Sequence, residues 1–276
     1  MDKLNAQAWT GRETCTQGCI TDYQARLIHA TIGEGAAPGQ LDPLPLLWHW
    51  CAFPPTAPME NLGRDGHERG SSLLPPVRLD RRMWAGGSLS FHQSLRVGEP
   101  IERMSRVKSV VEKEGKTGPM VLVSVEHSIY GARGLAIQEQ QDIVYLDIPD
   151  TFAPPAKRDI PAVSEQVPTP ETLLFRYSAL TFNAHRIHYD LPYTQQVEKY
   201  PALVVHGPLQ ASLLMRAAVR EKGRNPIYFS FRSVHPMFAG GTCDIATEAT
   251  DEGLRLWTGQ DGHQCMTATA TWEETQ

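Results

Sequence analysis

The densest run of proton-handling side chains covers residues 177–190 and reads YSALTFNAHRIHYD. It combines hydroxyls, an amide, a guanidinium and a carboxylate with the imidazoles of His185 and His188. Composition alone favours a polar surface loop, because such groups are costly to bury together unless they are solvated or used. Histidine titrates near neutral pH, so this run could also take up and release protons during a reaction.

A glycine at the start of a helix follows this run. Residues 204–208 read VVHGP and precede the apolar sequence LQASLLMRAAVR. Proline suits the first turn of a helix, where free amides and the helix dipole favour a developing negative charge. A base in the polar run and the amide of Gly207 could therefore remove a proton and stabilise the resulting anion.

The helix after Gly207 is predicted to be about 13 residues long, because one apolar stripe runs through it. The stripe consists of Leu209, Leu213, Leu214, Ala217 and Ala218. Alternating polar and apolar residues predict antiparallel strands in the segments 90–111, 118–130, 135–147, 228–250, 253–261 and 264–274. We expect a curved antiparallel sheet to wrap around the helix.

Two pieces of the chain repeat this order of features around a proline-rich segment. Residues 147–170 contain six prolines and little apolar periodicity, which predicts a linker. We divide the chain into an N-terminal repeat over 1–146, the linker over 147–170 and a C-terminal catalytic repeat over 171–276. Four prolines in residues 41–55 leave room for only a short helix there, so the N-terminal repeat is predicted to be a degenerate copy.

Composition limits the partners and the compartment. The 276-residue chain has a formal net charge of −5 and no basic stripe, which argues against a nucleic-acid partner. Its apolar runs are too short to cross a bilayer, and the N-terminus lacks the apolar region of an export signal. Cys15 and Cys19 have no second pair at zinc-finger spacing. We expect a cytoplasmic protein with reduced thiols, no membrane partner and no metal site.

The segments FRYSALTFNAHRIHYD and VVHGPLQASLL resemble the hydratase-2 motif of MaoC-like enoyl-CoA hydratases. Together with LAIQEQQDIVYLD and WHWCAFPP, they are more similar still to the FAS1-like dehydratase branch, which includes itaconyl-CoA and mesaconyl-C4-CoA hydratases. The resemblance implies an α+β double hot-dog fold, with two curved antiparallel sheets, a long central helix in the C-terminal repeat and a degenerate one in the N-terminal repeat. It also implies hydro-lyase activity.

The resemblance assigns roles to individual residues. His188 matches the catalytic histidine, and Gly207 matches the glycine whose amide faces the thioester carbonyl. Asn183 stands at the position of the family's catalytic aspartate, and a carboxamide can orient a water molecule but cannot take its proton. We therefore expect His188 alone to move the proton, with Asn183 as a positioning group.

Further substrate contacts are expected from Tyr177, Ser178, Arg186 and His206. Arg186 replaces a proline of the broader family, and its planar guanidinium could bind a free carboxylate or a CoA phosphate. An ion pair with Asp190 is an equally good interpretation. If the segment is extended, His185 and Tyr189 point away from His188 by simple alternation.

The leading hypothesis is reversible hydration of an α,β-unsaturated acyl-CoA, with itaconyl-CoA or mesaconyl-C4-CoA giving citramalyl-CoA. The alternatives are dehydration of 3-hydroxyacyl-ACP in fatty-acid synthesis, a catalytically silent acyl-CoA-binding protein, and a hot-dog thioesterase. No metal or redox cofactor is expected, because the thioester itself accepts the electrons. The expected partner is the acyl-CoA substrate, and assembly into a homo-oligomer is left open.

Overall fold

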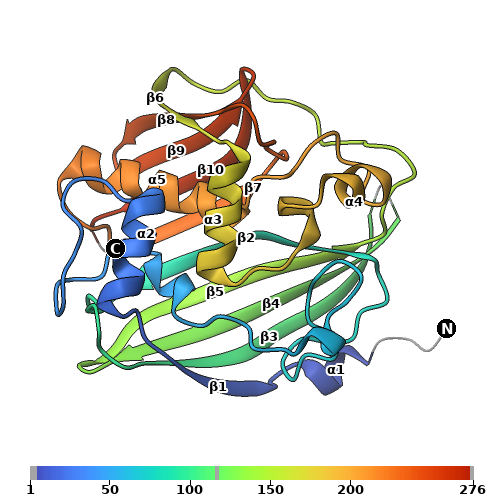
Figure 1. Cartoon of the computed structure of the whole chain (residues 1–276), viewed down its shortest axis with the longest axis horizontal. Helices are drawn as coiled ribbons and strands as arrows, with labels where there is room; N and C mark the ends of the chain where they lie inside the picture. Colours follow the sequence, from blue (N-terminus) through green and yellow to red (C-terminus); the bar gives the residue numbers. More distant parts are fainter. Residues whose placement is uncertain (1–4, 116–117, 274–276) are drawn as a thin grey trace.

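One antiparallel sheet of ten strands runs through residues 5–115 and 118–273, which the computed structural model describes (Figure 1). The strand order is β1-β3-β4-β5-β2-β7-β10-β9-β8-β6, so each half of the chain supplies one side of the sheet. The strands are β1 (Glu13–Gly18), β2 (Arg81–Phe91), β3 (Ile101–Gly115), β4 (Gly118–Gly131), β5 (Gly134–Leu146), β6 (Val163–Pro168), β7 (Tyr228–Ser233), β8 (Thr242–Thr250), β9 (Gly253–Gln260) and β10 (His263–Thr271).

The two sheets expected from the sequence are joined edge to edge at β2 and β7. These strands pair antiparallel over residues 86–90 and 228–232. Gly86 permits the close approach, because an added Cβ would lie 2.5 Å from the carbonyl oxygen of Phe231. The sheets of the two halves are therefore one continuous surface.

The long helix α5 (Gly207–Lys222) packs against β8, β9 and β10 of the C-terminal half. All five residues of its predicted apolar stripe are buried. Pro208 lies in its first turn, and the helix ends where Gly223 adopts a left-handed conformation with a φ of 65°. The predicted central helix is confirmed.

The corresponding position in the N-terminal half holds only η1 (Trp48–Cys51), a four-residue 3-10 helix. Prolines on both sides of η1 prevent a longer helix, which confirms the predicted degenerate copy. The other helices are α1 (Ala6–Trp9), α2 (Asp22–Ile32), η2 (Met59–Asn61), α3 (Glu171–Thr181), η3 (Arg186–His188) and α4 (Leu191–Gln196).

The proline-rich segment ends in a strand. Residues 147–162 contain no helix and no named strand, whereas β6 pairs antiparallel with β8 at the edge of the sheet. An edge strand tolerates proline, because one side of it is unpaired. The boundaries at residues 146 and 171 stay a prediction, since both halves share one sheet. The strand predicted over 264–274 ends at Thr271, and residue 274 lies outside the described residues.

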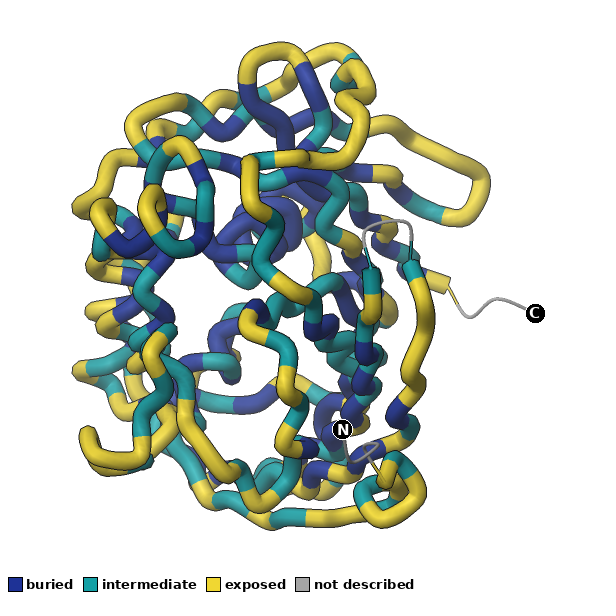
Figure 2. The backbone as a smooth tube through the Cα atoms, turned by 90° about the vertical axis from the view of Figure 1, so that its right-hand side faces the viewer, coloured by how far each residue is buried: buried dark blue, intermediate teal, exposed yellow. Residues whose placement is uncertain are grey.

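A hydrophobic core continues across the two halves. It includes Leu89 of β2, Ile129 of β4, Leu213 of α5 and Phe229 of β7. Figure 2 shows the buried residues gathered in the interior and the exposed ones on the outer turns. Among the described residues, no helix combines the length and apolar character needed to span a membrane.

Candidate active site

A cavity of about 1740 Å³ is lined by residues from both halves of the chain. It is larger than ordinary small-molecule sites, which occupy roughly 300–1,000 Å³. Five of the residues predicted from the sequence line it together: Tyr177, Ser178, Asn183, His188 and Gly207. Two others, Arg186 and His206, do not.

His188 ends the short helix η3, and a hydrogen bond fixes its ring. Nδ1 donates to the carbonyl oxygen of Val204 at 2.7 Å, because a carbonyl oxygen can only accept. The neutral ring therefore has an unprotonated Nε2. Burial lowers the pKa of His188 from 6.5 to about 4, although the hydrogen bond to Val204 opposes this shift. At neutral pH His188 is thus an uncharged base that lines the cavity.

His206 packs against the ring of His188. The two rings are stacked, with centroids 3.6 Å apart and planes inclined by 18°. Nε2 of His206 shares a hydrogen bond of 2.8 Å with the hydroxyl of Ser178, and Tyr177 packs against the same ring. His206 is 1% exposed and does not line the cavity, so the substrate contact predicted for it is not formed by this geometry. Its place before the first turn of α5 turns the ring inward.

Asn183 lies just beyond α3, where Phe182 takes a left-handed conformation with a φ of 51°. The side-chain oxygen of Asn183 accepts from the backbone N–H of His185 at 2.9 Å. The backbone N–H of Asn183 donates to the Ser178 carbonyl oxygen at 2.8 Å. The side-chain oxygen keeps a second lone pair and the carboxamide NH₂ keeps its hydrogens, so either can orient a ligand.

Gly207 opens α5 at the wall of the cavity. Its amide has no acceptor among the described residues, and Pro208 has no amide hydrogen. An added Cβ would meet its nearest neighbours, Ser233 Oγ at 3.6 Å and the Trp84 carbonyl oxygen at 3.9 Å, at ordinary contact distances. The fold itself therefore does not require glycine here, and the missing side chain leaves room for a ligand beside a free N–H group.

Comparison with known proteins identifies the family. The family model of hydroxyacyl-thioester dehydratase type 2 matches residues 47–239. The chain is also 41% identical over 276 residues to the mesaconyl-C(4)-CoA hydratase of Chloroflexus aurantiacus, covering 98% of each chain. The chain belongs to the hydroxyacyl-thioester dehydratase type 2 family. It is a hydro-lyase, as expected from the motifs.

Solved structures support the fold of this family member. A MaoC-like dehydratase from Phytophthora capsici superposes with a TM-score of 0.72 at 12% identity, covering 96% of each chain. A Mycobacterium tuberculosis protein with a double hot-dog fold superposes with a TM-score of 0.56 at 12% identity, covering 95% of each chain. The predicted α+β double hot-dog fold is confirmed.

Arg186 departs from the substrate contact predicted for it from the family motif. Its Nη2 and Nε donate to Asp190 Oδ2 at 2.6 and 2.9 Å, and its guanidinium lies 4.1 Å from the ring centroid of Tyr193. The 3-10 turn of η3 carries the side chain away from the cavity, which it does not line. The alternative interpretation, an ion pair with Asp190, is the one observed.

His185 lies at the cavity, contrary to the expected alternation. The prediction was wrong because residues 186–188 form a 3-10 helix rather than an extended segment. His185 is 5% exposed, its ring centroid is 5.4 Å from that of His188, and its Nε2 has no partner among the described residues. Tyr189 also lines the cavity, contrary to the same prediction; it is half exposed, and its hydroxyl donates to the Ala184 carbonyl oxygen at 3.0 Å.

The N-terminal half of this family member also contributes to the cavity, and His67 is the contributor that sequence reasoning did not single out. His67, Arg82 and Trp50 line the same cavity as His188. From the sequence alone, Arg78, Arg81 and Arg82 form a local positive spot that fits either a solvated face or a contact with the nucleotide phosphates of CoA. Arg81 is paired with buried Glu198 at 2.8 Å, which leaves Arg82 as the member that faces the cavity without a salt bridge among the described residues.

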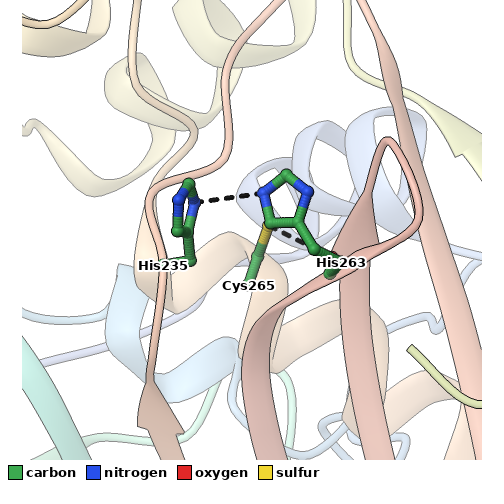
Figure 3. A group of neighbouring side chains, drawn as sticks. All are labelled: His235, His263 and Cys265. Atoms are coloured by element: carbon green, nitrogen blue, oxygen red, sulfur yellow. Dashed lines mark hydrogen bonds between the residues drawn. The ribbon is translucent and has the colours of Figure 1, made fainter. Parts of the chain in front are cut away.

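Two groups of described residues have the side chains to hold a metal ion. One consists of Asp65, His67 and His185 beside the cavity. The other consists of His235, His263 and Cys265, which Figure 3 shows close together near the start of β10. In the second group His235 Nδ1 lies 3.0 Å from the Pro236 carbonyl oxygen and 3.1 Å from His263 Nε2. It either donates its proton to the carbonyl oxygen or, without a proton, accepts from His263.

Proposed function

We propose that the enzyme reversibly adds water to an α,β-unsaturated acyl-CoA thioester, with His188 as the acid/base and the Gly207 amide as the donor to the thioester oxygen. The observation that carries this proposal is the shared cavity. An uncharged histidine with a fixed Nδ1–H lines the same space as a helix amide that has no acceptor in the described part of the chain. These are the two groups that hydration of an enoyl thioester requires.

The reaction needs two proton transfers: one from water to His188 and one from His188 to Cα. Nε2 of His188 takes a proton from water while the water oxygen bonds to Cβ, and the electrons of the double bond move to the thioester oxygen. The Gly207 N–H and the dipole of α5 stabilise this enolate. When the enolate collapses, His188 returns its proton to Cα. Burial disfavours the imidazolium, so the proton is readily given back. Dehydration follows the same steps in reverse.

The substrate we favour is a C4-branched dicarboxylic acyl-CoA. Mesaconyl-C4-CoA is the first choice, because the Chloroflexus relative that is named for this substrate is similar over nearly the whole chain. Itaconyl-CoA is the second: its double bond lies β,γ to the thioester, so a proton must first move from Cα to the methylene carbon, which gives mesaconyl-C4-CoA. Either substrate is then expected to give citramalyl-CoA. In mesaconyl-C4-CoA the free carboxylate is attached to the carbon that receives the hydroxyl group, so its partner must lie near His188. Arg82 is the candidate, since it lines the cavity and its charge acts on neighbouring His185.

A substrate panel tests this proposal. Loss of the enoyl-thioester absorbance is followed with mesaconyl-C4-CoA and crotonyl-CoA, and formation of citramalyl-CoA from itaconyl-CoA is followed by mass spectrometry. We expect the highest kcat/KM with a dicarboxylic substrate. Preference for crotonyl or longer linear chains would refute the dicarboxylic assignment. Faster turnover of a 3-hydroxyacyl-ACP would favour fatty-acid synthesis instead. Binding without any absorbance change would indicate a silent acyl-CoA-binding protein, and release of free CoA thiol a thioesterase.

A further inference from the structure

A loop of the N-terminal half, residues 61–69, is docked on the segment that carries His188. Gly66 has a φ of 91°, and an added Cβ would lie 1.8 Å from the Ala184 carbonyl oxygen, so the two backbones touch there. The amide and guanidinium of Arg186 donate to two carbonyl oxygens of the loop at 2.9 and 3.0 Å. These contacts use main-chain atoms of the loop, so side-chain replacements within it leave the docking in place.

Inside this loop Asp65 holds His67 in one orientation. Asp65 Oδ1 accepts from the His67 amide at 3.0 Å, and Oδ2 accepts from Nδ1 at 2.7 Å. Because Nδ1 carries the proton, Nε2 is the acceptor of the neutral ring. His67 lines the cavity whereas Asp65 lies behind it. The ring of His67 is 4.2 Å from that of His185, which in turn neighbours His188.

The charges in this loop support an ionised carboxylate beside a neutral imidazole. Burial raises the pKa of Asp65, but its hydrogen bonds with His67 and the charges of His67 and Arg82 outweigh this and bring the pKa to about 2. Burial and Arg82 lower the pKa of His67, and Asp65 opposes them. At neutral pH the pair is therefore an aspartate that orients an uncharged histidine.

We propose that His67 is a second catalytic residue and Asp65 its positioning residue. In this arrangement Nε2 of His67 accepts a hydrogen bond from the water, or from the product hydroxyl, whose other proton passes to His188. The inference rests on the proposed function. His67 gives the water an imidazole acceptor beside the carboxamide of Asn183, whose side-chain oxygen also accepts from the His185 amide. The N-terminal half thereby supplies an acceptor to a site whose His188, Asn183 and Gly207 come from the C-terminal half.

This role leaves the balance of protons unchanged. His188 takes one proton from water and returns it to Cα, while His67 only accepts a hydrogen bond before and after the transfer. A water molecule held by two acceptors has its oxygen lone pair directed at Cβ, which lowers the entropic part of the barrier. Asp65 contributes by keeping the proton on Nδ1, because the other tautomer would present a donor to the water.

The test compares His67→Gln and Asp65→Asn with the wild-type enzyme on the best enoyl-CoA of the panel. We expect His67→Gln to lower kcat about 100-fold and Asp65→Asn about tenfold, with KM nearly unchanged. Asp65→Glu should restore part of the loss. His92→Gln and Asp42→Asn are matched controls, because both residues are exposed and lie outside the cavity.

A spectroscopic signature separates this role from a structural one. Nitrogen-15 NMR of the imidazoles should show the Nδ1–H tautomer of His67 in the wild type and a mixture of tautomers in Asp65→Asn, with unchanged circular dichroism. If His67→Gln keeps wild-type kcat while His188→Gln abolishes turnover, this inference is overturned and the proposed function stands. If the wild type hydrates no member of the panel, both fail together.

Discussion

Lowering the pH tests the state of His188 directly, because its folded pKa of about 4 differs from the ordinary 6.5. At pH 5 a histidine with a pKa of about 4 is about 90% neutral, whereas an ordinary histidine is about 3% neutral. If neutral His188 is the base, kcat/KM at pH 5 stays near its value at pH 7. The acid limb of the profile then falls at about pH 4.

Crotonyl-CoA is the substrate for this assay, since it has no free carboxylate whose titration would distort the profile. Initial rates between pH 4 and 8, at substrate concentrations well below KM, report the free enzyme. An acid limb near pH 6.5 would refute the claim that a buried, uncharged His188 acts as the base. His188→Gln, which cannot accept a proton, should show no turnover across the whole range.

The same shift predicts the pH dependence of stability. The unfolded state binds the proton more tightly than the folded state, so His188 destabilises the fold as the pH falls from 6.5 towards 4. Between pH 7 and pH 5 this amounts to about 2 kcal/mol. Urea unfolding should therefore show that His188→Gln loses about 2 kcal/mol less than the wild type over this interval. Equal losses in both proteins would contradict the depressed pKa.

Three other predictions concern two residues of the cavity and the effect of removing metal ions. Gly207→Ala should leave the urea midpoint unchanged or slightly raised, since its Cβ has room, but lower kcat/KM at least about tenfold by crowding the thioester. Arg82→Gln should lower kcat/KM about tenfold for mesaconyl-C4-CoA but not for crotonyl-CoA, with exposed Arg78→Gln as control; equal losses on both substrates would assign Arg82 to the CoA moiety. Dialysis against a chelator should leave the hydration rate unchanged, whereas a loss restored by zinc would show that an ion is held by one of the two groups, His235, His263 and Cys265 or Asp65, His67 and His185.

Local patterns in the sequence predicted the elements whose burial repeats at a fixed period. In α5 the apolar stripe, and in β4 the alternating Val121, Val123 and Val125, form the face that packs against the core. All of these residues are buried. Periodicity fails where the period changes within a few residues. His185 was predicted to point away from the cavity and Arg186 towards the substrate, but His185 lines the cavity and Arg186 does not. The cause is the 3-10 turn of residues 186–188, which no local sequence pattern predicts.

Local sequence patterns also do not predict contacts between segments that are far apart in the chain. Asp65 and His67 meet the His188 segment across more than one hundred residues, and nothing in the spacing of D-G-H indicates which surface this loop will cover. The motif located Asn183, His188 and Gly207 because they lie on one continuous segment and the helix that follows it. Their partners from the other half required the three-dimensional structure.

The degenerate helix of the N-terminal half and the large cavity have a common physical cause. In the C-terminal half the 16 residues of α5 cover the strands, whereas η1 offers only four residues at the corresponding place. Side chains of the N-terminal sheet, among them Arg103 and Gln141, therefore line an open space instead of a helix.

That open space has a rigid wall. Trp50 of η1 lines it, and the indole N–H donates to Glu139 at 2.9 Å. Glu139 is buried, which raises its pKa, but His49 and neighbouring groups more than compensate and bring the pKa to about 2, so the acceptor stays ionised. Because η1 is short, it leaves space for an acyl group, and its hydrogen bond to buried Glu139 keeps it in place. The proposed function therefore assigns the acyl pocket mainly to the N-terminal half, where the helix is short, and the thioester contact to the amide of Gly207 in the C-terminal half.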